Sequence, residues 1–430
     1  MSKLIINGGK PLKGIAKPVA NKNSIIKLIP ACLLTHHTVT LHNVPRSSDV
    51  KYMCQILEKL WWTIEYIDNN TTLKINCANV HSYEVDTELG DKIKASVMFL
   101  GPLLVKFGKA SMPTPQGCKL GTRPLDAFIE NMIEMGAEYR HEHGTYLLEA
   151  KKLTARNIWQ RFPSVTWTEN LVLLAVTIPW ITTIYNAWCE PHTQELCEFL
   201  NAMGAKISWI GTNKIVIEGV KELAGTERTI RSDHLDVWWF IAASAITGGE
   251  ITIQNAVVNQ MTGILHAYKK LGVHVEIDAM KDEIFVPAKQ ELIIHKTIKG
   301  DLFDLKALQR PLFPADLIHV AVVLALKAKG SAIFYNTFYE YGFFFVEELA
   351  KMKALTVMAD PWRIITFWET QFKPAHLLCP NIIQAGYGLT LAMLAAPGIS
   401  TLNVCQPLFR RYPDIVEQFT ALGGEMRVEG

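Results

Sequence analysis

One cysteine of this 430-residue chain lies in a glycine-containing segment beside two cations. Cys118 follows Gly117, and Lys119 and Arg123 come shortly after it. Nearby positive charge lowers the pKa of a thiol and makes the group a usable acid or nucleophile. The pattern therefore predicts a reactive cysteine, and the alternative at this point is an ordinary loop cysteine.

A second set of polar residues lies where apolar helices are predicted to begin. These starts cover residues 21–24, 92–95, 164–166, 233–235, 313–316 and 381–384. The first N–H groups of a helix lack partners within it, and the helix dipole favours anions there. Six polar starts, two of them with lysines, indicate a shared anion-binding cleft. The alternative is ordinary capping by Asn, Ser and Asp.

The elements that would position these residues come from a six-fold internal repeat. Each copy reads as an apolar helix, a strand, an amphipathic helix, a glycine and a hairpin. The glycine positions are 61, 136, 204, 272, 353 and 423, with Trp61 and Lys353 in place of glycine. Glycine takes the left-handed conformation past a helix end without a Cβ penalty, so each replacement should cost about 1 kcal/mol.

Six helices are predicted to be apolar on all sides. They cover residues 24–35, 95–107, 168–178, 236–247, 316–328 and 384–396. Such a helix must be covered on every side. Three of them, each backed by a small sheet, would make one domain of about 200 residues. The sequence therefore predicts an α/β (α+β) protein with two similar three-repeat domains.

Composition excludes several classes of protein. Hydrophobic residues make up 49% and charged residues 20%, which is typical of globular chains. The net charge is +2 without a long basic run, so we expect no nucleic-acid partner. No apolar stretch reaches the roughly 18 residues needed to cross a bilayer, so we expect no membrane insertion.

The chain start does not read as a signal peptide. The eight cysteines form no CxxC pair and are typical of reduced cytoplasmic thiols. No zinc-type spacing is present, so we expect no metal site.

Several segments together resemble the UDP-N-acetylglucosamine 1-carboxyvinyltransferase family. They are residues 6–9, 12–14, Lys22-Asn23, Gly117-Cys118 and residues 121–126, and the likeness runs from Leu4 to the C-terminus. The resemblance implies the inside-out α/β barrel of enolpyruvyl transferases, with one domain at 22–231 and another at 1–21 plus 232–430. It implies phosphoenolpyruvate and UDP-N-acetylglucosamine as substrates, no cofactor and no obligate protein partner.

The resemblance also assigns roles to residues. Cys118 would protonate the enol methylene and form an adduct with phosphoenolpyruvate, and Asp316 would be the base near the sugar hydroxyl. Lys22, Arg123 and Arg410 would hold phosphate and carboxylate. The remaining substrate-binding positions are Asn23, Lys94, Pro124, Leu125, Asp126, Ala127, Ser164, Val165, Thr166, Phe338 and Glu340.

Other positions depart from the family pattern. Lys94, Gly342 and Gln384 stand where the family commonly has arginine, and bulky pairs at 166–167 and 238–239 replace small residues. They favour an alternative, a relative that keeps the fold, has weakened or lost catalysis, and binds a nucleotide sugar or a partner. A third reading, transfer to shikimate 3-phosphate, conflicts with the Gly117-Cys118 segment.

Overall fold

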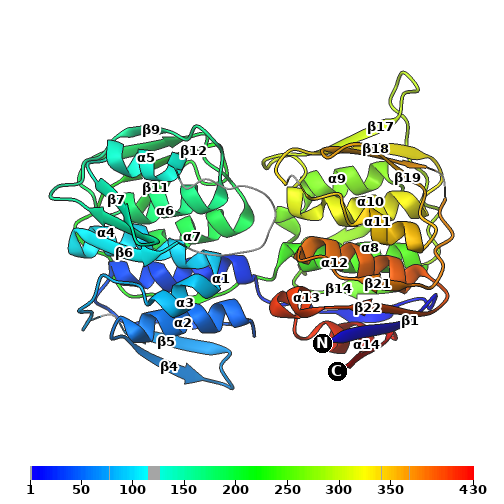
Figure 1. The fold of residues 1–430 in the computed structure, drawn as a ribbon, viewed down its shortest axis with the longest axis horizontal. Coiled ribbons are helices and arrows are strands. Elements are labelled where there is room, and N and C mark those ends of the chain that lie inside the picture. The colour runs from blue at the N-terminus through cyan, green and yellow to red at the C-terminus, as the bar shows by residue number, and fades with distance from the viewer. Residues whose placement is uncertain (1, 77, 115–125, 340, 368) are drawn as a thin grey trace. The chain divides into compact units, whose positions relative to one another are not determined.

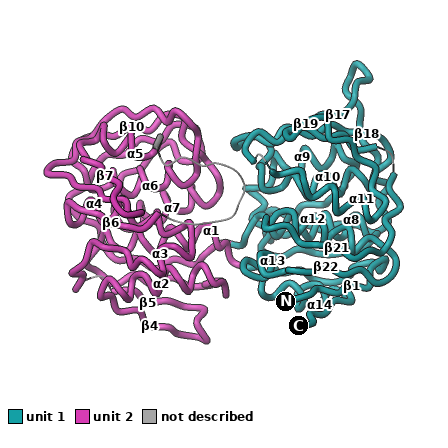
Figure 2. Tube along the Cα trace, viewed as in Figure 1, with its two compact units in different colours: residues 1–19, 119–122, 232–430 teal, residues 20–118, 123–231 magenta. Residues whose placement is uncertain are grey.

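The computed structural model describes residues 2–76, 78–114, 126–339, 341–367 and 369–430. These residues form two compact units, shown in different colours in Figure 2. Unit 2 contains the described residues between 20 and 231. Unit 1 contains the described residues up to 19 and those from 232 onward.

Unit 2 has three small sheets around its helices (Figure 1). Its helices are α1 (Lys22–Ala31), η1 (Cys32–Leu34), α2 (Ser48–Lys59), α3 (Thr87–Lys92), η2 (Lys94–Phe99), α4 (Leu100–Phe107), α5 (Asp126–Glu134), α6 (Val165–Ala175) and α7 (Pro191–Ala202). Its strands are β3 (Val39–His42), β4 (Thr63–Ile67), β5 (Thr72–Asn76), β6 (Lys109–Pro113), β7 (Glu138–Glu142), β8 (Thr145–Glu149), β9 (Asn157–Trp159), β10 (Ile181–Tyr185), β11 (Lys206–Ser208), β12 (Lys214–Glu218) and β13 (Glu227–Thr229).

Unit 1 repeats this plan with three further sheets. Its helices are α8 (His234–Thr247), η3 (Val258–Gln260), α9 (Thr262–Lys270), η4 (Ala315–Leu317), α10 (Ile318–Lys327), α11 (Val346–Lys351), α12 (Ile383–Ala395), α13 (Gln406–Arg411) and α14 (Ile415–Ala421). Its strands are β1 (Lys3–Gly8), β2 (Lys13–Ala16), β14 (Glu250–Ile253), β15 (Glu276–Asp278), β16 (Glu283–Val286), β17 (Phe303–Ala307), β18 (Ser331–Asn336), β19 (Thr356–Asp360), β20 (Arg363–Phe367), β21 (His376–Leu378), β22 (Gly398–Asn403) and β23 (Glu425–Glu429).

The six predicted apolar helices are confirmed as α1, η2 with α4, α6, α8, α10 and α12. Most residues on every face of these helices are buried, as in α8, where Thr247 is the one residue that is not buried. The described strands form separate sheets outside these helices and do not close into one continuous sheet. The mixed α/β class is therefore confirmed, with helices inside and sheets outside.

The sheets share one topology. In five sheets the strand after the buried helix pairs with one strand of a hairpin, as β10 does with β12 and β18 with β20. In the other, β22 pairs with β1, which in turn pairs with β23. In five sheets a fourth strand adds in parallel at the edge, as β9 does on β10. In the sixth sheet, β6-β8-β7, that place holds only a bridge between Glu84 and Ser111. The N-terminal strands β1 and β2 complete two sheets of unit 1.

All six repeat-glycine positions have a left-handed backbone. The four glycines have φ between 83° and 109°, and Trp61 and Lys353 each have φ 70°. Trp180 and Trp209 share this conformation, with φ 79° and 62°. A bulky residue with positive φ is strained because its Cβ crowds the following carbonyl oxygen. The three tryptophans are 58–83% exposed, so little burial offsets that strain.

Replacing Trp61, Trp180 and Trp209 by glycine is expected to stabilise the protein. Each change should raise the unfolding free energy by about 1 kcal/mol, because glycine adopts the left-handed region freely. Urea unfolding of the single and triple variants measures this. The matched controls are alanines at the same positions, which keep the Cβ and the strain. Glycine variants no more stable than their alanine controls would contradict the prediction.

The adjacent tryptophans Trp238 and Trp239 are buried rather than exposed. The Trp238 ring meets Tyr268 edge-on at 4.7 Å between centroids, and Trp239 meets Tyr387 at 3.9 Å. Phe419 lies 4.8 Å from Trp239. Edge-to-face geometry is favourable for aromatic pairs. The unit therefore accommodates these bulky residues in an aromatic cluster.

Candidate active site

The start of helix α1 in unit 2 carries two predicted site residues. The side chain of Asn21 caps the helix by accepting hydrogen bonds from the backbone N–H groups of Asn23 and Ser24. Lys22 Nζ lies 2.7 Å from Asp49 Oδ2, and both side chains are largely buried. Asn23 is partly exposed. The cap therefore fixes the backbone from which Lys22 and Asn23 extend.

Four further predicted residues of unit 2 also lie at helix starts. Lys94 is the first residue of η2, and Ser164 is the N-cap residue of α6, followed by Val165 and Thr166. All four are partly exposed. The next residue, Trp167, is buried, and its ring stacks on Phe128 with centroids 4.5 Å apart and planes at 10°. The tryptophan therefore packs against α5.

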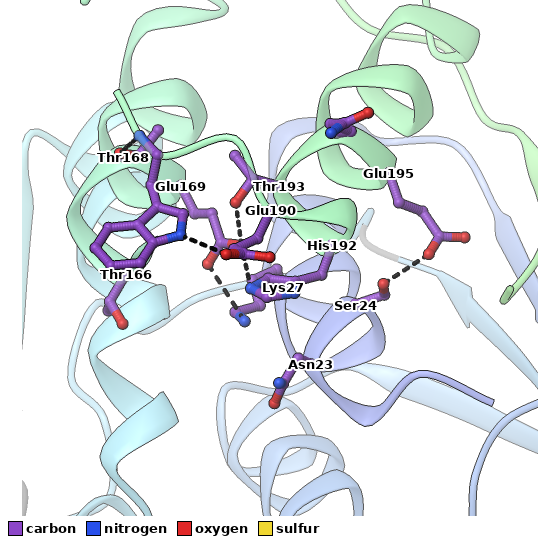
Figure 3. Close-up of polar contacts among 12 residues, drawn as sticks. Asn23, Ser24, Lys27, Thr166, Thr168, Glu169, Glu190, His192, Thr193 and Glu195 are labelled. Atoms are coloured by element: carbon purple, nitrogen blue, oxygen red, sulfur yellow. Dashed lines mark hydrogen bonds and ion pairs between the residues drawn. The ribbon is translucent and has the colours of Figure 1, made fainter. Parts of the chain in front are cut away.

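A buried polar network joins α1, α6 and α7 close to these starts (Figure 3). Lys27 Nζ on α1 lies 3.3 Å from Glu169 Oε2 on α6. Thr193 on α7 donates a hydrogen bond to Glu169 Oε1 at 3.0 Å, and His192 Nε2 lies 3.8 Å from the same oxygen. Burial raises the pKa of Glu169 to about 7, although Lys27 opposes the shift. Sequence reasoning missed this network.

A second contact set ties the same helices together. Ser24 donates a hydrogen bond to Glu195 Oε2 at 2.6 Å, and the backbone N–H of Arg231 donates to Glu195 Oε1 at 3.2 Å. Arg231 in turn pairs with Glu198 at 2.7 Å. Helix α7 therefore anchors the first turn of α1 and the end of unit 2, and these contacts support the predicted site residues of that turn.

The buried carboxyl of Glu169 predicts a pH-dependent stability. Its folded pKa of about 7 exceeds its ordinary value of 4.5. Its protonated form therefore stabilises the fold fully below pH 4.5, and this contribution is lost as the pH rises through about 7. The loss is on the order of 3 kcal/mol. Glu169→Gln should remove this pH dependence. The unfolding free energy of the variant should therefore rise relative to that of wild type from pH 5 to pH 8.

Urea unfolding at both pH values measures this difference. Glu218→Gln is the matched control, because Glu218 is exposed on β12 and pairs with Lys206 at the surface. A difference for Glu169→Gln that stays constant with pH would contradict the prediction.

In unit 1, Asp316 lies on η4 at the start of the buried helix α10. Gln384 at the start of α12 donates a hydrogen bond from Nε2 to Asp316 Oδ1 at 2.6 Å. The hydroxyl of Tyr339 donates to the same oxygen at 3.3 Å. Two polar helix starts that were predicted separately therefore meet at one carboxylate.

Asp316 and Gln384 line a small cavity together with Arg411. Its remaining lining residues are Leu235, Trp239, Leu317, Val320, Ile383, Tyr387 and Tyr412. The cavity has a volume of about 20 Å³, which is enough for one water, since a water needs roughly 10–15 Å³. The space therefore holds about one water-sized group beside the Asp316 carboxylate. The arrangement suits an oxygen nucleophile beside a carboxylate base.

Arg411, rather than its neighbour Arg410, borders this cavity. Its guanidinium donates a hydrogen bond to Asp233 at 2.6 Å, and both side chains are buried. Asp233 also caps α8 by accepting from the backbone N–H of Leu235. Arg410 is partly exposed on α13. The sequence did not single out Arg411, because two adjacent arginines on a short helix carry the same signal.

Several predicted site residues lie outside the described residues. These are Cys118, Arg123, Pro124, Leu125 and Glu340. Asp126 and Ala127 begin helix α5. Phe338 is partly exposed, and its backbone N–H donates to the Asn336 side chain at 3.2 Å. Their predicted roles therefore stay predictions.

The described ranges contain neither a metal-type cluster nor a helix that could span a membrane. No group of three or more His, Cys, Asp or Glu side chains there is arranged to hold a metal ion. No helix in that part of the chain is both long and apolar enough to cross a membrane.

Comparison with known proteins gives one consistent family. The model of the family "EPSP synthase (3-phosphoshikimate 1-carboxyvinyltransferase)" matches residues 6–419. The chain is 35% identical to a UDP-N-acetylglucosamine 1-carboxyvinyltransferase of Borrelia garinii subsp. bavariensis, with 99% of each chain covered. It is 33% identical to the enzyme of that name from Treponema pallidum, with 100% of each chain covered.

Solved structures agree at the level of the fold. The enolpyruvyl transferase NikO from Streptomyces tendae superposes with a TM-score of 0.87 at 21% identity, covering 99% of this chain and 98% of that one. An EPSP synthase from Acinetobacter baumannii gives 0.77 at 17% identity, with 100% of each chain covered.

Proposed function

The chain belongs to the EPSP synthase family and, within it, to the UDP-N-acetylglucosamine 1-carboxyvinyltransferases, and we propose that it transfers an enolpyruvyl group to UDP-N-acetylglucosamine. The donor is phosphoenolpyruvate, the acceptor is the 3′-hydroxyl of the sugar, and phosphate is released. The observation that carries the proposal is the identity of 33–35% over essentially the whole length of enzymes with that name. The reaction would be the first committed step of peptidoglycan synthesis, in the cytoplasm, and so would serve cell shape and division.

The proposed chemistry is addition followed by elimination. The 3′-oxygen bonds to C2 of phosphoenolpyruvate while Asp316 takes the hydroxyl proton and Cys118 protonates the C3 methylene. Loss of phosphate from C2 and of one proton from C3 then restores the double bond in the product. A cavity bordered by the Asp316 carboxylate supports the first role. The role of Cys118 rests on the sequence.

Cations are needed because the donor carries both phosphate and carboxylate. We propose that Lys22, Lys94, Arg123 and Arg410 serve this need. Arg411 is an additional candidate, since it borders the cavity that contains Asp316. Asn23 and the start of α6 at Ser164–Thr166 would contact the nucleotide sugar.

The direct test is phosphate release from purified protein. Release should require both substrates, and mass spectrometry should find the enolpyruvyl ether of UDP-N-acetylglucosamine. Replacing the sugar nucleotide by shikimate 3-phosphate should give no release. Folded protein that releases no phosphate with either acceptor would refute the proposed reaction.

A second candidate function rests on the absence of arginine at positions 342 and 384. It is binding of a nucleotide sugar without turnover. Calorimetry distinguishes the two, because the second function predicts binding of UDP-N-acetylglucosamine together with no phosphate release.

A further inference from the structure

We propose that Gln384 is a positioning residue that fixes one oxygen of the Asp316 carboxylate and leaves the other to take the substrate proton. The inference rests on the proposed transfer reaction and adds a residue to it. The sequence resemblance implies that the family commonly has arginine here, so Gln384 is a departure of this chain. Gln384 acts through Asp316.

The hydrogen bonds at Asp316 are asymmetric. Gln384 Nε2 at 2.6 Å and the Tyr339 hydroxyl at 3.3 Å both donate to Oδ1. Among the described residues, Oδ2 receives no side-chain or backbone hydrogen bond of its own. Two donors from different elements, α12 and the segment after β18, fix the carboxylate plane. Oδ2 is then the oxygen with capacity for a substrate hydroxyl.

The place of Gln384 supports a functional role over a packing role. Its amide borders the same cavity as Asp316 and Arg411. Its Oε1 is buried and has no hydrogen-bond partner in the described part of the protein. Buried acceptors are normally satisfied within a fold, so this oxygen is placed for a group that enters the cavity. One amide therefore contacts both the carboxylate and the space where the hydroxyl would bind.

A neutral amide also differs from arginine in what it does to a base. Arginine would form a charge-assisted pair with the carboxylate and compete with the substrate for its oxygens. Glutamine orients the carboxylate through one donor and leaves its negative charge uncompensated at that contact. The nearest buried cation of the cavity, Arg411, is bound to Asp233. Asp316 is therefore held by a neutral donor at this contact, while the Arg411 guanidinium is bound to Asp233.

The test is a steady-state comparison of Gln384→Met with wild type. Methionine keeps the length of the side chain and removes the donor. We expect kcat to fall by roughly 10- to 100-fold, because small displacements of a catalytic group have effects of that size. KM for both substrates should stay within about threefold. Tyr339→Phe, which removes the longer bond, should lower kcat by only a few fold.

The matched control is Gln254→Met. Gln254 donates to Glu283 at 2.9 Å in the same unit, so the change removes the same kind of bond elsewhere. It should leave kcat and KM unchanged. The double variant Asp316→Asn/Gln384→Met should be no slower than Asp316→Asn alone, because a positioning residue has no effect once its base is lost. An unchanged kcat for Gln384→Met, or losses that multiply in the double variant, would overturn the proposal.

Failure of the reaction itself remains distinguishable. If wild type turns over and Gln384→Met is equally fast, the positioning role is wrong and the proposed function stands. If wild type does not turn over, urea unfolding is compared for wild type, Asp316→Ala, Gln384→Met and the double variant that combines these two changes, because alanine removes the acceptor that asparagine keeps. This double-mutant cycle should then still show coupling between positions 316 and 384, and independent effects would refute the contact.

Discussion

Replacing Asp316 by asparagine is expected to lower kcat for phosphate release by roughly 10²- to 10⁴-fold, the range typical of a lost general base. Asparagine has nearly the same shape and can still accept the hydrogen bond from Gln384, so the cavity should keep its form. It cannot take the proton of the sugar hydroxyl. The effect should therefore appear in kcat, with binding of UDP-N-acetylglucosamine in calorimetry close to wild type.

The control for this variant is Asp278→Asn. Asp278 is on β15 of the same unit, away from the cavity, and pairs with Lys281 at 3.2 Å. Its replacement should leave turnover unchanged. An Asp316→Asn variant that is folded, binds the sugar nucleotide and turns over at more than a tenth of the wild-type rate would exclude Asp316 as the base.

Replacing Cys118 by alanine is expected to have an effect of similar size, roughly 10²- to 10⁴-fold on phosphate release. Cys118 lies outside the described residues, so this prediction rests on the sequence, where Lys119 and Arg123 follow the thiol. Loss of the thiol removes the proposed donor to the C3 methylene. Cys77→Ala, at the other cysteine that the structure does not describe, should retain activity.

Thiol labelling gives an independent measurement. The six described cysteines are buried, and burial raises the pKa of Cys54 and of Cys379 to about 12. Few of the Cys54 and Cys379 thiols are ionised at neutral pH, so an alkylating reagent should modify Cys118 before the six buried cysteines. Phosphoenolpyruvate should protect it. Equal labelling of Cys118 and the buried cysteines, or no loss of turnover in Cys118→Ala, would contradict the proposed role.

The local features of the fold were predictable because they depend on neighbours in sequence. The ranges of the buried helices followed from unbroken apolar runs, and the left-handed turns followed from glycine at fixed places in a repeat. Trp61 and Lys353 have the glycine conformation although neither is glycine. The repeat therefore identifies backbone conformation more reliably than the individual residue does.

Contacts between distant segments were not predictable. The pair Lys27–Glu169 joins α1 to α6, and the cluster of Trp239 with Tyr387 joins α8 to α12. Nothing local in the sequence specifies which buried charge or ring will meet which partner. The same limit applies to Arg411, whose contact with Asp233 depends on how α13 packs against the start of α8.

The exposed tryptophans in left-handed conformations have a consequence at the level of the gene. Tryptophan is encoded by UGG and, in some genetic codes, by UGA; these two codons differ from the glycine codons GGG and GGA by one base each. Random mutagenesis followed by selection for stability should therefore recover glycine first at positions 61, 180 and 209. The same pattern would arise if the organism reads a codon at these positions as glycine and another genetic code reads that codon as tryptophan. The masses of peptides spanning these positions, taken from the organism that makes the protein, would show which residue its ribosomes insert.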